Sequence, residues 1–306
     1  MTINFAIDYQ TALQKTFAEN GLLYSQRLWA SPSNNIIQWV GQKTVRLPRL
    51  TINEGRKDRK RRTIVADQVT ANYSNDWITY ELENERYWQT LIDPSDVDET
   101  NFTTTIANIT RSYNEQEKVP EMDKQMFSSL FAKIEEYDDT RTDGAVNIHE
   151  VDLDTTNILD TFDTMMTQMD EKSVPADRVM YVTPTVLKIL KNAEGLTRTL
   201  NVQDQRENVS RIVSMLDNIE LISVPSNTFK TAYDFTEGAK EAPGAKQIQM
   251  LLVHIPSMCA PQKYSFVGLD QPAAGTSGNY HYYEQAYDDV IVFEGKEDGI
   301  AFAVAP

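Results

Sequence analysis

The amino-acid sequence predicts a mixed α+β fold with three parts: a projecting two-stranded arm, a long helix and an α/β region. Two stretches of alternating apolar and polar residues flank a basic tract, which indicates the arm. An apolar stripe at helical spacing follows, and short apolar strands then alternate with amphipathic helices. With 306 residues, of which 41% are hydrophobic, the chain can form one large or two medium domains.

The composition favours a soluble protein that is made and used in a reducing cytoplasm. The longest apolar runs, such as residues 250–255, are far shorter than the roughly 20 residues that cross a membrane. The start of the sequence also lacks the pattern of a signal peptide. We therefore expect no membrane partner. Cys259 is the single cysteine, so no intrachain disulfide can form.

Residues 1–43 show short helical patterns broken by turn signals, with a helix expected over residues 13–23. Strand-like alternation then occupies residues 43–50 and again residues 65–91. These two stretches predict a long β-hairpin. An isolated hairpin is at best marginally stable in water, so we expect it to lie against its own domain or against a neighbouring subunit.

The segment between the two strands is strongly basic and is expected to form the tip of the hairpin. Only Asp58 interrupts its six cations, which are Arg56, Lys57, Arg59, Lys60, Arg61 and Arg62. Such tracts often bind nucleic acid, and a nucleic-acid binding module that uses residues 56–62 is one alternative function.

The net charge of the chain argues against that alternative. The whole chain carries −16, and because the basic tract contributes +5, the remaining residues carry −21. A nucleic-acid-binding domain normally presents a positive face, whereas most of this surface would repel a polyphosphate. The most available acidic partner for the tract is another copy of this chain.

A long helix is expected after the hairpin. Residues 93–100 supply turn residues and acids suited to a helix start. Phe102, Ile106, Ile109 and Tyr113 then recur at helical spacing, and a second stripe runs from residue 122 to residue 134. Pro120 interrupts the pattern, which leaves either one kinked helix or two helices in tandem.

An α/β region follows, over about residues 147–260. Strands are expected at 178–182, 219–224 and 248–255, and helices at 158–169, from Thr183 to a stop at Gly195, and around 209–216. Alternating helices and continuous apolar strands imply a central sheet covered by helices. The tail returns to two or three strands, which we expect to rejoin the first domain, making that domain discontinuous.

No motif points to catalysis, a metal or a cofactor. His149, His254 and His281 are spread over the sequence without metal-ligand spacing. Acids at 93–99 and at 152–154 lack the pattern of a calcium loop, and helix capping explains them equally well. We expect no enzyme, no cofactor and no metal site. A cytosolic α/β hydrolase with an unrecognised site stays open as an alternative.

Several segments resemble the major capsid proteins of tailed double-stranded-DNA bacteriophages, particularly long-tailed phages of Gram-positive hosts. The resemblance covers residues 40–305 and rests on the order of five segments along the chain. They are WITYELENERYWQTLIDPSDVDET (77–100), VPEMDKQMFSSLF (119–131), RVMYVTPTVLKILK (178–191), NIELISVPSNTF (218–229) and YYEQAYDDVIVFEGKEDGI (282–300).

This resemblance implies the tailed-phage capsid fold, in which an extended hairpin called the E-loop, a peripheral (P) domain with a spine helix and a β-sheet, and an axial (A) domain follow an N-terminal arm. The implied divisions are the arm at 1–43, the E-loop at 44–88, the P domain with its spine helix at 89–146, the A domain at 147–260, and a return to the P domain at 261–306.

The resemblance also implies a structural function: self-assembly into hexamers and pentamers that form an icosahedral head around the packaged genome. The implied partners are further copies of the chain, scaffolding and portal proteins, and double-stranded DNA bound without sequence specificity. The implied location is the virion, with assembly in the host cytoplasm. About 40 residues before the E-loop leave no room for a large cleaved scaffolding segment, and Met1 argues against processing.

The basic tract at the E-loop tip is then expected to rest on acidic residues of a neighbouring subunit. A contact between different patches on successive copies closes into rings or extends further, which suits a shell. The candidate acidic partners are Asp93, Asp96, Asp98, Glu99, Glu115 and Glu117.

Overall fold

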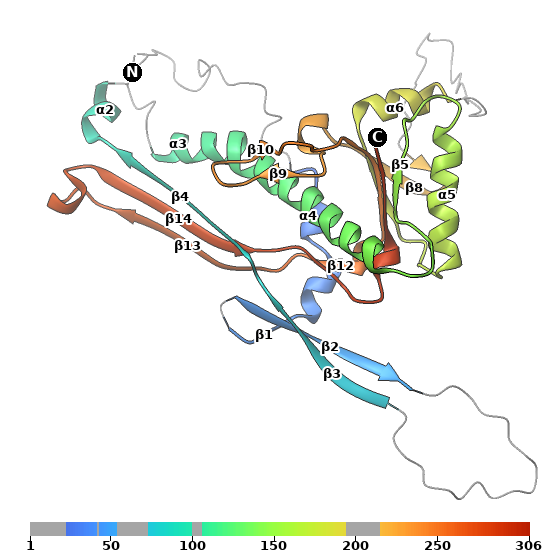
Figure 1. Cartoon of the computed structure of the whole chain (residues 1–306). Helices are drawn as coiled ribbons and strands as arrows, with labels where there is room; N and C mark the ends of the chain where they lie inside the picture. The colour runs from blue at the N-terminus through green and yellow to red at the C-terminus, as the bar shows by residue number, and fades with distance from the viewer. Residues whose placement is uncertain (1–22, 42, 54–72, 100–105, 194–214) are drawn as a thin grey trace, which may run out of the picture.

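The computed structural model describes residues 23–41, 43–53, 73–99, 106–193 and 215–306. The elements form an elongated molecule in which a hairpin arm projects at one end and helix α2 lies at the other (Figure 1). A three-stranded sheet and a long helix connect these ends to a body built around a six-stranded sheet.

The arm is an antiparallel hairpin of β2 (Thr44–Ile52) and β3 (Tyr73–Glu81), and β1 (Gln38–Trp39) pairs with the other edge of β2. The two long strands pair over their whole length, from Thr44 opposite Glu81 to Ile52 opposite Tyr73. The predicted hairpin is therefore confirmed for its strands. Its expected tip, with the basic tract at 56–62, lies outside the described residues.

The strand-like stretch 65–91 does not form one strand, because its end belongs to a second sheet. Leu82 is buried directly after Glu81, and the backbone N–H of Glu83 donates to Asp289 Oδ2 at 3.1 Å, so the chain leaves the hairpin here. The hairpin thus ends at Glu81, whereas the sequence predicts that the E-loop extends to residue 88. The second sheet is antiparallel and contains β13 (Gln262–Asp270), β14 (Tyr280–Asp288) and β4 (Asn84–Ile92), in that order.

A long helical segment runs along this second sheet. Helix α2 (Pro94–Glu99) comes first, and the backbone N–H of Ser95 donates to Asp93 Oδ1 at its start. The long segment then consists of α3 (Ile106–Tyr113), a π-turn η2 (Asn114–Lys118) and α4 (Val119–Thr140).

The helical path continues through the π-turn, because Tyr113, Lys118 and Val119 all keep right-handed helical dihedral angles. Pro120 is the second residue of α4, directly after the π-turn, so its ring and missing N–H are accommodated where the helix is locally widened. From Ile106 onward, the two predicted helical stripes therefore belong to one continuous segment with a local widening rather than to separated helices. Phe102, the first residue of the first stripe, lies outside the described residues.

The six-stranded sheet forms the centre of the body. Its strand order is β5 (Ile148–Glu150), β16 (Ile300–Val304), β11 (Ile248–Val253), β6 (Val179–Val182), β8 (Ile219–Ser223) and β7 (Met215–Leu216). The β6, β8 and β11 strands match the expected positions. Residues 194–214, which include Gly195 and most of the helix expected around 209–216, lie outside the described residues, and Leu216 lies in β7.

The last strand corrects one expectation. β16 lies between β5 and β11 in the six-stranded sheet, whereas the sequence places the whole of 261–306 with the first domain. β13 and β14 do pair with β4, so only the earlier part of the tail returns as expected. Every residue of β16 is buried, which requires a position inside a covered sheet.

Helices cover both faces of the six-stranded sheet, as Figure 1 shows. On one face, Phe127, Leu130 and Ile134 of α4 pack against sheet residues such as Tyr181 and Phe302. On the other face lie α5 (Ile158–Glu171) and α6 (Pro184–Lys191), which bury Phe162, Met165, Met169, Val186 and Leu190. The methionines of α5 therefore belong to the core.

Short elements connect these parts. They are the helix α1 (Gln26–Trp29), the 3-10 turns η1 (Pro32–Ile36), η3 (Ser226–Thr228), η4 (Ile255–Ser257), η5 (Ala274–Thr276) and η6 (Glu297–Gly299), the hairpin of β9 (Tyr233–Asp234) and β10 (Lys240–Glu241), and the pair β12 (Met258–Cys259) and β15 (Ile291–Val292). Asp123 of α4 fixes the segment that leads to α1, because its carboxylate accepts hydrogen bonds from the backbone N–H groups of Tyr24 and Ser25.

Candidate functional site

The base of the arm is fixed to the body by one face of β2. Val45 is fully buried in a cluster with Leu82, Cys259, Tyr287 and Ile291. Burial also raises the pKa of the Cys259 thiol to about 12, so this cysteine is a small core residue and not a nucleophile.

The distal half of the arm exposes apolar side chains on its other face. Because side chains alternate along a strand and directly opposed residues share a face, the pairing of Pro48 with Trp77 and of Ile52 with Tyr73 places these residues together. Leu50 lies between them, and the exposed fractions of Leu50, Ile52 and Tyr73 are 66%, 72% and 63%. We call this set the apolar strip: Pro48, Leu50, Ile52, Tyr73 and Trp77.

The opposite face of the distal arm is polar. It carries Thr51, Ser74 and Asp76, and Arg49 forms an ion pair with Glu294 of the body at 2.6 Å. Both partners are half exposed, so this pair contributes only about 0 to 1 kcal/mol. The arm is therefore amphipathic, with an apolar face that this chain leaves in solvent.

A second uncovered apolar surface lies on the three-stranded sheet, on the face turned away from α4. Tyr87 and Leu91 of β4 are 65% and 59% exposed. Beside them, the Tyr283 ring lies 6.0 Å from the Tyr87 ring and 6.3 Å from the Phe266 ring. A Cβ on Gly268 would approach the Phe266 ring to 3.1 Å, so glycine lets this ring lie flat on the sheet. We call Tyr87, Leu91, Phe266 and Tyr283 the aromatic face.

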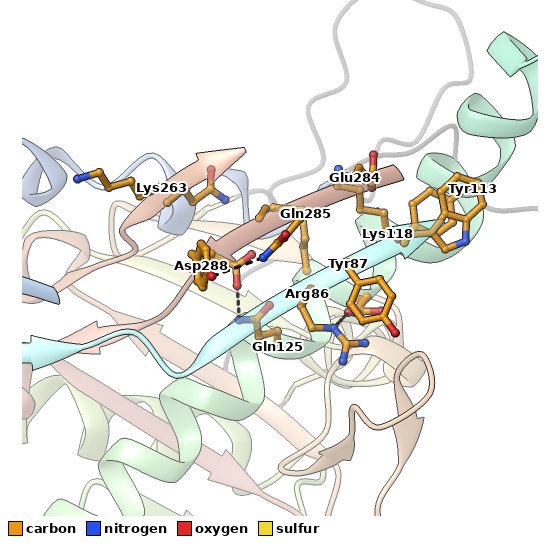
Figure 2. Close-up of a pocket in the computed structure, with 15 residues that line it drawn as sticks. Arg86, Tyr87, Tyr113, Lys118, Gln125, Lys263, Glu284, Gln285 and Asp288 are labelled. Carbon is orange, nitrogen blue, oxygen red and sulfur yellow. Dashed lines mark hydrogen bonds and ion pairs between the residues drawn. The ribbon is translucent and has the colours of Figure 1, made fainter. Parts of the chain in front are cut away.

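The other face of this sheet is joined to the long helical segment by polar contacts. Arg86 Nε pairs with Glu121 at 2.7 Å, and Lys118 Nζ pairs with Glu284 at 3.1 Å. The Trp88 ring stacks on Tyr113 with the centroids 4.0 Å apart. These contacts surround a cavity of about 410 Å³ between sheet and helix (Figure 2).

Asp288 is a buried acid at the edge of this cavity. Its carboxylate accepts a hydrogen bond from Gln125 Nε2 at 2.9 Å (Figure 2). It also accepts one from Asn84 Nδ2 at 2.5 Å. Burial raises the pKa of Asp288, and the charges of Asp289 and Glu121 add to the effect. The Asp288 carboxylate therefore links the three-stranded sheet to α4, which is a structural role.

The described part of the chain presents no recognisable catalytic or metal centre. Within it, no group of three or more His, Cys, Asp and Glu side chains is arranged to hold a metal ion. In the same residues, no helix is long and apolar enough to cross a membrane. His254 Nδ1 lies 2.9 Å from Ser257 Oγ, but both residues are buried, so no substrate can reach this pair.

The structure brings none of the predicted acidic partners to the arm of the same chain. Asp93 and Asp96 lie at α2, at the opposite end of the molecule from the arm (Figure 1). The 20 residues from Tyr73 to Ile92 separate the two ends, and extended strands rise about 3.3 Å per residue, giving a length on the order of 60 Å. The side chains of Asp98 and Glu99 lie outside the described part.

The two acidic residues of the π-turn differ in their surroundings. Glu115 pairs with Arg111 one turn earlier at 2.8 Å, and Glu117 is exposed. Glu115 is therefore already paired within its own chain, and which acids receive the basic tract stays a prediction. The apolar strip and the aromatic face were not predicted from the sequence, although alternate residues of 48–52 and 87–91 carried the signal.

This architecture, with a projecting arm, a spine helix and two sheets, is the predicted capsid-type fold, and comparison with solved structures supports it. The capsid protein of the mature bacteriophage PhiM1 particle superposes with a TM-score of 0.60 and 14% identity, covering 86% of this chain and 82% of that chain. The capsid of a native GTA particle gives a TM-score of 0.56 and 12% identity, and covers 99% of both chains. The capsid of cyanophage P-SCSP1u gives 0.54 and 12%, covering 88% of this chain and 85% of that chain.

The chain thus has the fold of phage capsid proteins, and the fold prediction is confirmed. No family model matches the sequence, and no curated protein matches it. The structural neighbours include a cyanophage capsid, so the Gram-positive host stays a prediction. They give no support to the hydrolase or the nucleic-acid binding module.

Proposed function

We propose that this chain is the major capsid protein of a tailed double-stranded-DNA bacteriophage and that it assembles into the hexamers and pentamers of an icosahedral head. The arm is the observation that carries this proposal. It projects from the body, its apolar strip is in solvent, and a soluble chain stabilises such a surface by covering it with a partner. The shared fold makes a further copy the best candidate for that partner.

Repeated weak contacts suit a shell. A contact between the arm of one copy and a different surface of the next is heterologous, so it forms closed rings or continues into larger assemblies. Contacts of modest strength reinforce one another once several are made in the same particle, because each further contact forms within the assembly.

The remaining partners follow from the same proposal. Scaffolding and portal proteins would guide assembly in the host cytoplasm, and the finished virion would hold DNA without sequence-specific binding. The net charge of −16 supports the last point, because an acidic surface keeps a polyphosphate from adhering. A structural role requires no enzymatic activity.

Electron microscopy of the purified chain tests the proposal, combined with sedimentation over a range of concentrations. We expect rings or closed shells of regular size. A filter-binding experiment with short duplex DNA at about 0.15 M salt should show negligible affinity, because the screening length of about 8 Å leaves the acidic surface repulsive at contact distance. A chain that stays single at every concentration, or that binds DNA tightly, would contradict the proposal.

A further inference from the structure

We propose that the cavity between the three-stranded sheet and α4 binds a small primary ammonium compound, whose charged group contacts Oδ2 of Asp288. This site lies within a single chain and is lined by described residues. It therefore goes beyond the proposed function and does not depend on it.

The cavity has a small residue in the middle of one wall. Side chains alternate along a strand, so Glu284, Ala286 and Asp288 of β14 share one face, and all three line the cavity. Ala286 contributes only a methyl group between two longer side chains. Met122 and Gln125 of α4 line the same space. The volume of about 410 Å³ lies within the range of small-molecule sites.

One oxygen of the Asp288 carboxylate has no hydrogen bond. Oδ1 accepts both hydrogen bonds that this carboxylate makes, from Gln125 Nε2 and from Asn84 Nδ2. No donor among the described residues reaches Oδ2, although Asp288 is only 9% exposed. A buried acceptor without a donor is unfavourable, and such acceptors are rare in folded proteins. Oδ2 is therefore the atom that a ligand in the cavity would satisfy.

The charge of Asp288 is also unbalanced within the cavity. The two other acids of the lining each pair with a cation: Glu121 with Arg86 at 2.7 Å and Glu284 with Lys118 at 3.1 Å. Asp288 accepts only from two neutral amide groups, and it forms no ion pair with the part of the chain that the structure describes. A buried carboxylate of this kind is stabilised when a cation enters the cavity.

The third cation of the lining does not supply this charge. Lys263 extends away from Asp288 (Figure 2). Its Nζ donates to the backbone oxygen of Gly41 at 3.1 Å and lies 4.4 Å from the centre of the Trp39 ring. Burial accordingly raises the pKa of Asp288, because no neighbouring cation offsets the lost solvation.

The single free oxygen favours an ammonium group over other cations. A guanidinium group binds a carboxylate best through both oxygens, but Oδ1 of Asp288 already accepts two hydrogen bonds. A divalent metal ion needs several oxygen ligands. Within the described ranges, no three His, Cys, Asp or Glu side chains are grouped to hold one. An ammonium group is a compact charge that can donate to one oxygen.

The rest of the cavity suits a short alkyl chain. Four residue steps of β14 separate Asp288 from Glu284, which is about 13 Å at about 3.3 Å per residue. Ala286 and Met122 provide apolar surface along this path, and Trp88, opposite Glu284, lines its far end. A short chain can therefore bury its methylene groups while its ammonium group stays at Asp288.

Thermal unfolding of the full, unassembled chain with three small probes tests the site. Butylamine carries the ammonium group and a short chain, 1-butanol has the same chain without the charge, and tetramethylammonium has the charge without an N–H donor. Each probe is titrated to about 50 mM at constant ionic strength, because so small a ligand is expected to bind in the millimolar range. We expect a saturable rise of the Tm with butylamine alone. No rise with butylamine, or an equal rise with either other probe, would overturn the proposal.

Asp288→Asn tests where the amine binds. It should weaken butylamine binding by about tenfold or more, because the charge-assisted hydrogen bond is lost. Asp289→Asn is the matched control, since it removes the same charge from the next residue, which lines a different cavity. Each shift is measured against the amine-free Tm of the same variant. Equal weakening in both variants, or none in Asp288→Asn, would mean that the acidic surface attracts cations generally, and would overturn the proposal.

A variant that fills the cavity keeps the test decisive if Asp288→Asn does not fold. Ala286→Leu leaves every charge in place and extends into the space beside Asp288. It should also weaken butylamine binding by about tenfold or more, as measured by isothermal titration calorimetry. Wild-type affinity in folded Ala286→Leu would overturn the proposed position of the ligand. None of these outcomes depends on whether the chain forms shells.

Discussion

At the scale of single residues, buried acids hold the elements of this chain together. Asp123 fixes the segment before α1, and Asp288 joins β14 to α4 through Gln125 and to β4 through Asn84. Burial raises the pKa of both carboxyl groups, so their ionised forms are less stable in the folded chain than in water.

The raised pKa of Asp288 predicts a pH-dependent effect of Asp288→Asn. Between the ordinary aspartate pKa of about 3.9 and the higher value in the folded chain, the folded state binds more protons than the unfolded state, so stability falls as the pH rises. Asparagine keeps the acceptor oxygen and carries no charge. We expect the Tm of Asp288→Asn to exceed that of the wild type at pH 7 and the difference to shrink as the pH falls toward 4.

Thermal unfolding of the unassembled chain between pH 4 and pH 8 measures this difference. Asp76→Asn is the control, because Asp76 is an exposed carboxylate on the arm and should give the wild-type Tm throughout. A Tm of Asp288→Asn below that of the wild type at pH 7 would show that the charge of Asp288 stabilises the contact of β14 with α4 and β4.

At the scale of elements, the two halves of the long helical segment differ in how much of their surface is packed against the rest of the molecule. Helix α4 buries eight residues, most of them apolar and packed against the six-stranded sheet, whereas α3 buries none. The π-turn between them turns Tyr113 onto Trp88. One extra residue in the turn thus orients the end of α3 toward the three-stranded sheet.

Tyr113→Ala should loosen α3 and leave α4 unchanged. A stacked aromatic pair contributes about 0.5 to 1.5 kcal/mol beyond its buried area, so we expect the amides of α3 to exchange with deuterium up to about tenfold faster. Arg111→Ala, which removes only an exposed ion pair with Glu115, is the control and should change the exchange of α3 little. Equal acceleration in α3 and α4 would contradict this division.

The elements also show what could be predicted from the sequence. Local patterns predicted the hairpin strands, the spine helix and strands β6, β8 and β11, because each depends on alternation or helical spacing within the segment itself. The position of β16 was not predicted, since its partners β5 and β11 come from distant parts of the chain. The π-turn was missed because Pro120 suggested a break, although it only marks the first turn of α4.

The candidate site was predicted less completely than the fold. Charge drew attention to residues 56–62, which lie outside the described residues, and to the acids at 93–99. The apolar strip was overlooked because Leu50, Ile52 and Tyr73 look like ordinary strand residues. Only the register of β2 against β3 shows that they share one exposed face.

At the scale of the whole molecule, raising the salt concentration should weaken the effects of charge on assembly and leave the effect of apolar area unchanged. Under the proposed function, the basic tract would attract acidic surface on other copies, while the net charge of −16 would make copies repel each other. Salt at about 1 M shortens the screening length to roughly 3 Å and weakens both effects. The apolar strip is unaffected, so shells should still form.

Replacing Arg59, Lys60, Arg61 and Arg62 by alanine should reverse the response to salt. We expect wild-type assembly to weaken as salt rises, because attraction by the tract is lost. In the variant only Arg56 and Lys57 remain beside Asp58, so repulsion dominates, and assembly should start weaker and improve with salt. Light scattering at matched concentrations measures both trends, and responses in the same direction would show that the tract makes no attractive contact.

The three-stranded sheet has a consequence for how a new chain behaves while the ribosome is still making it. The arm and β4 are synthesised within the first 92 residues, but β13 and β14, which complete the sheet, appear only after residue 261. At about 5 to 20 residues per second, an emerging polypeptide therefore carries the exposed apolar strip for many seconds before the strands that complete its three-stranded sheet are made.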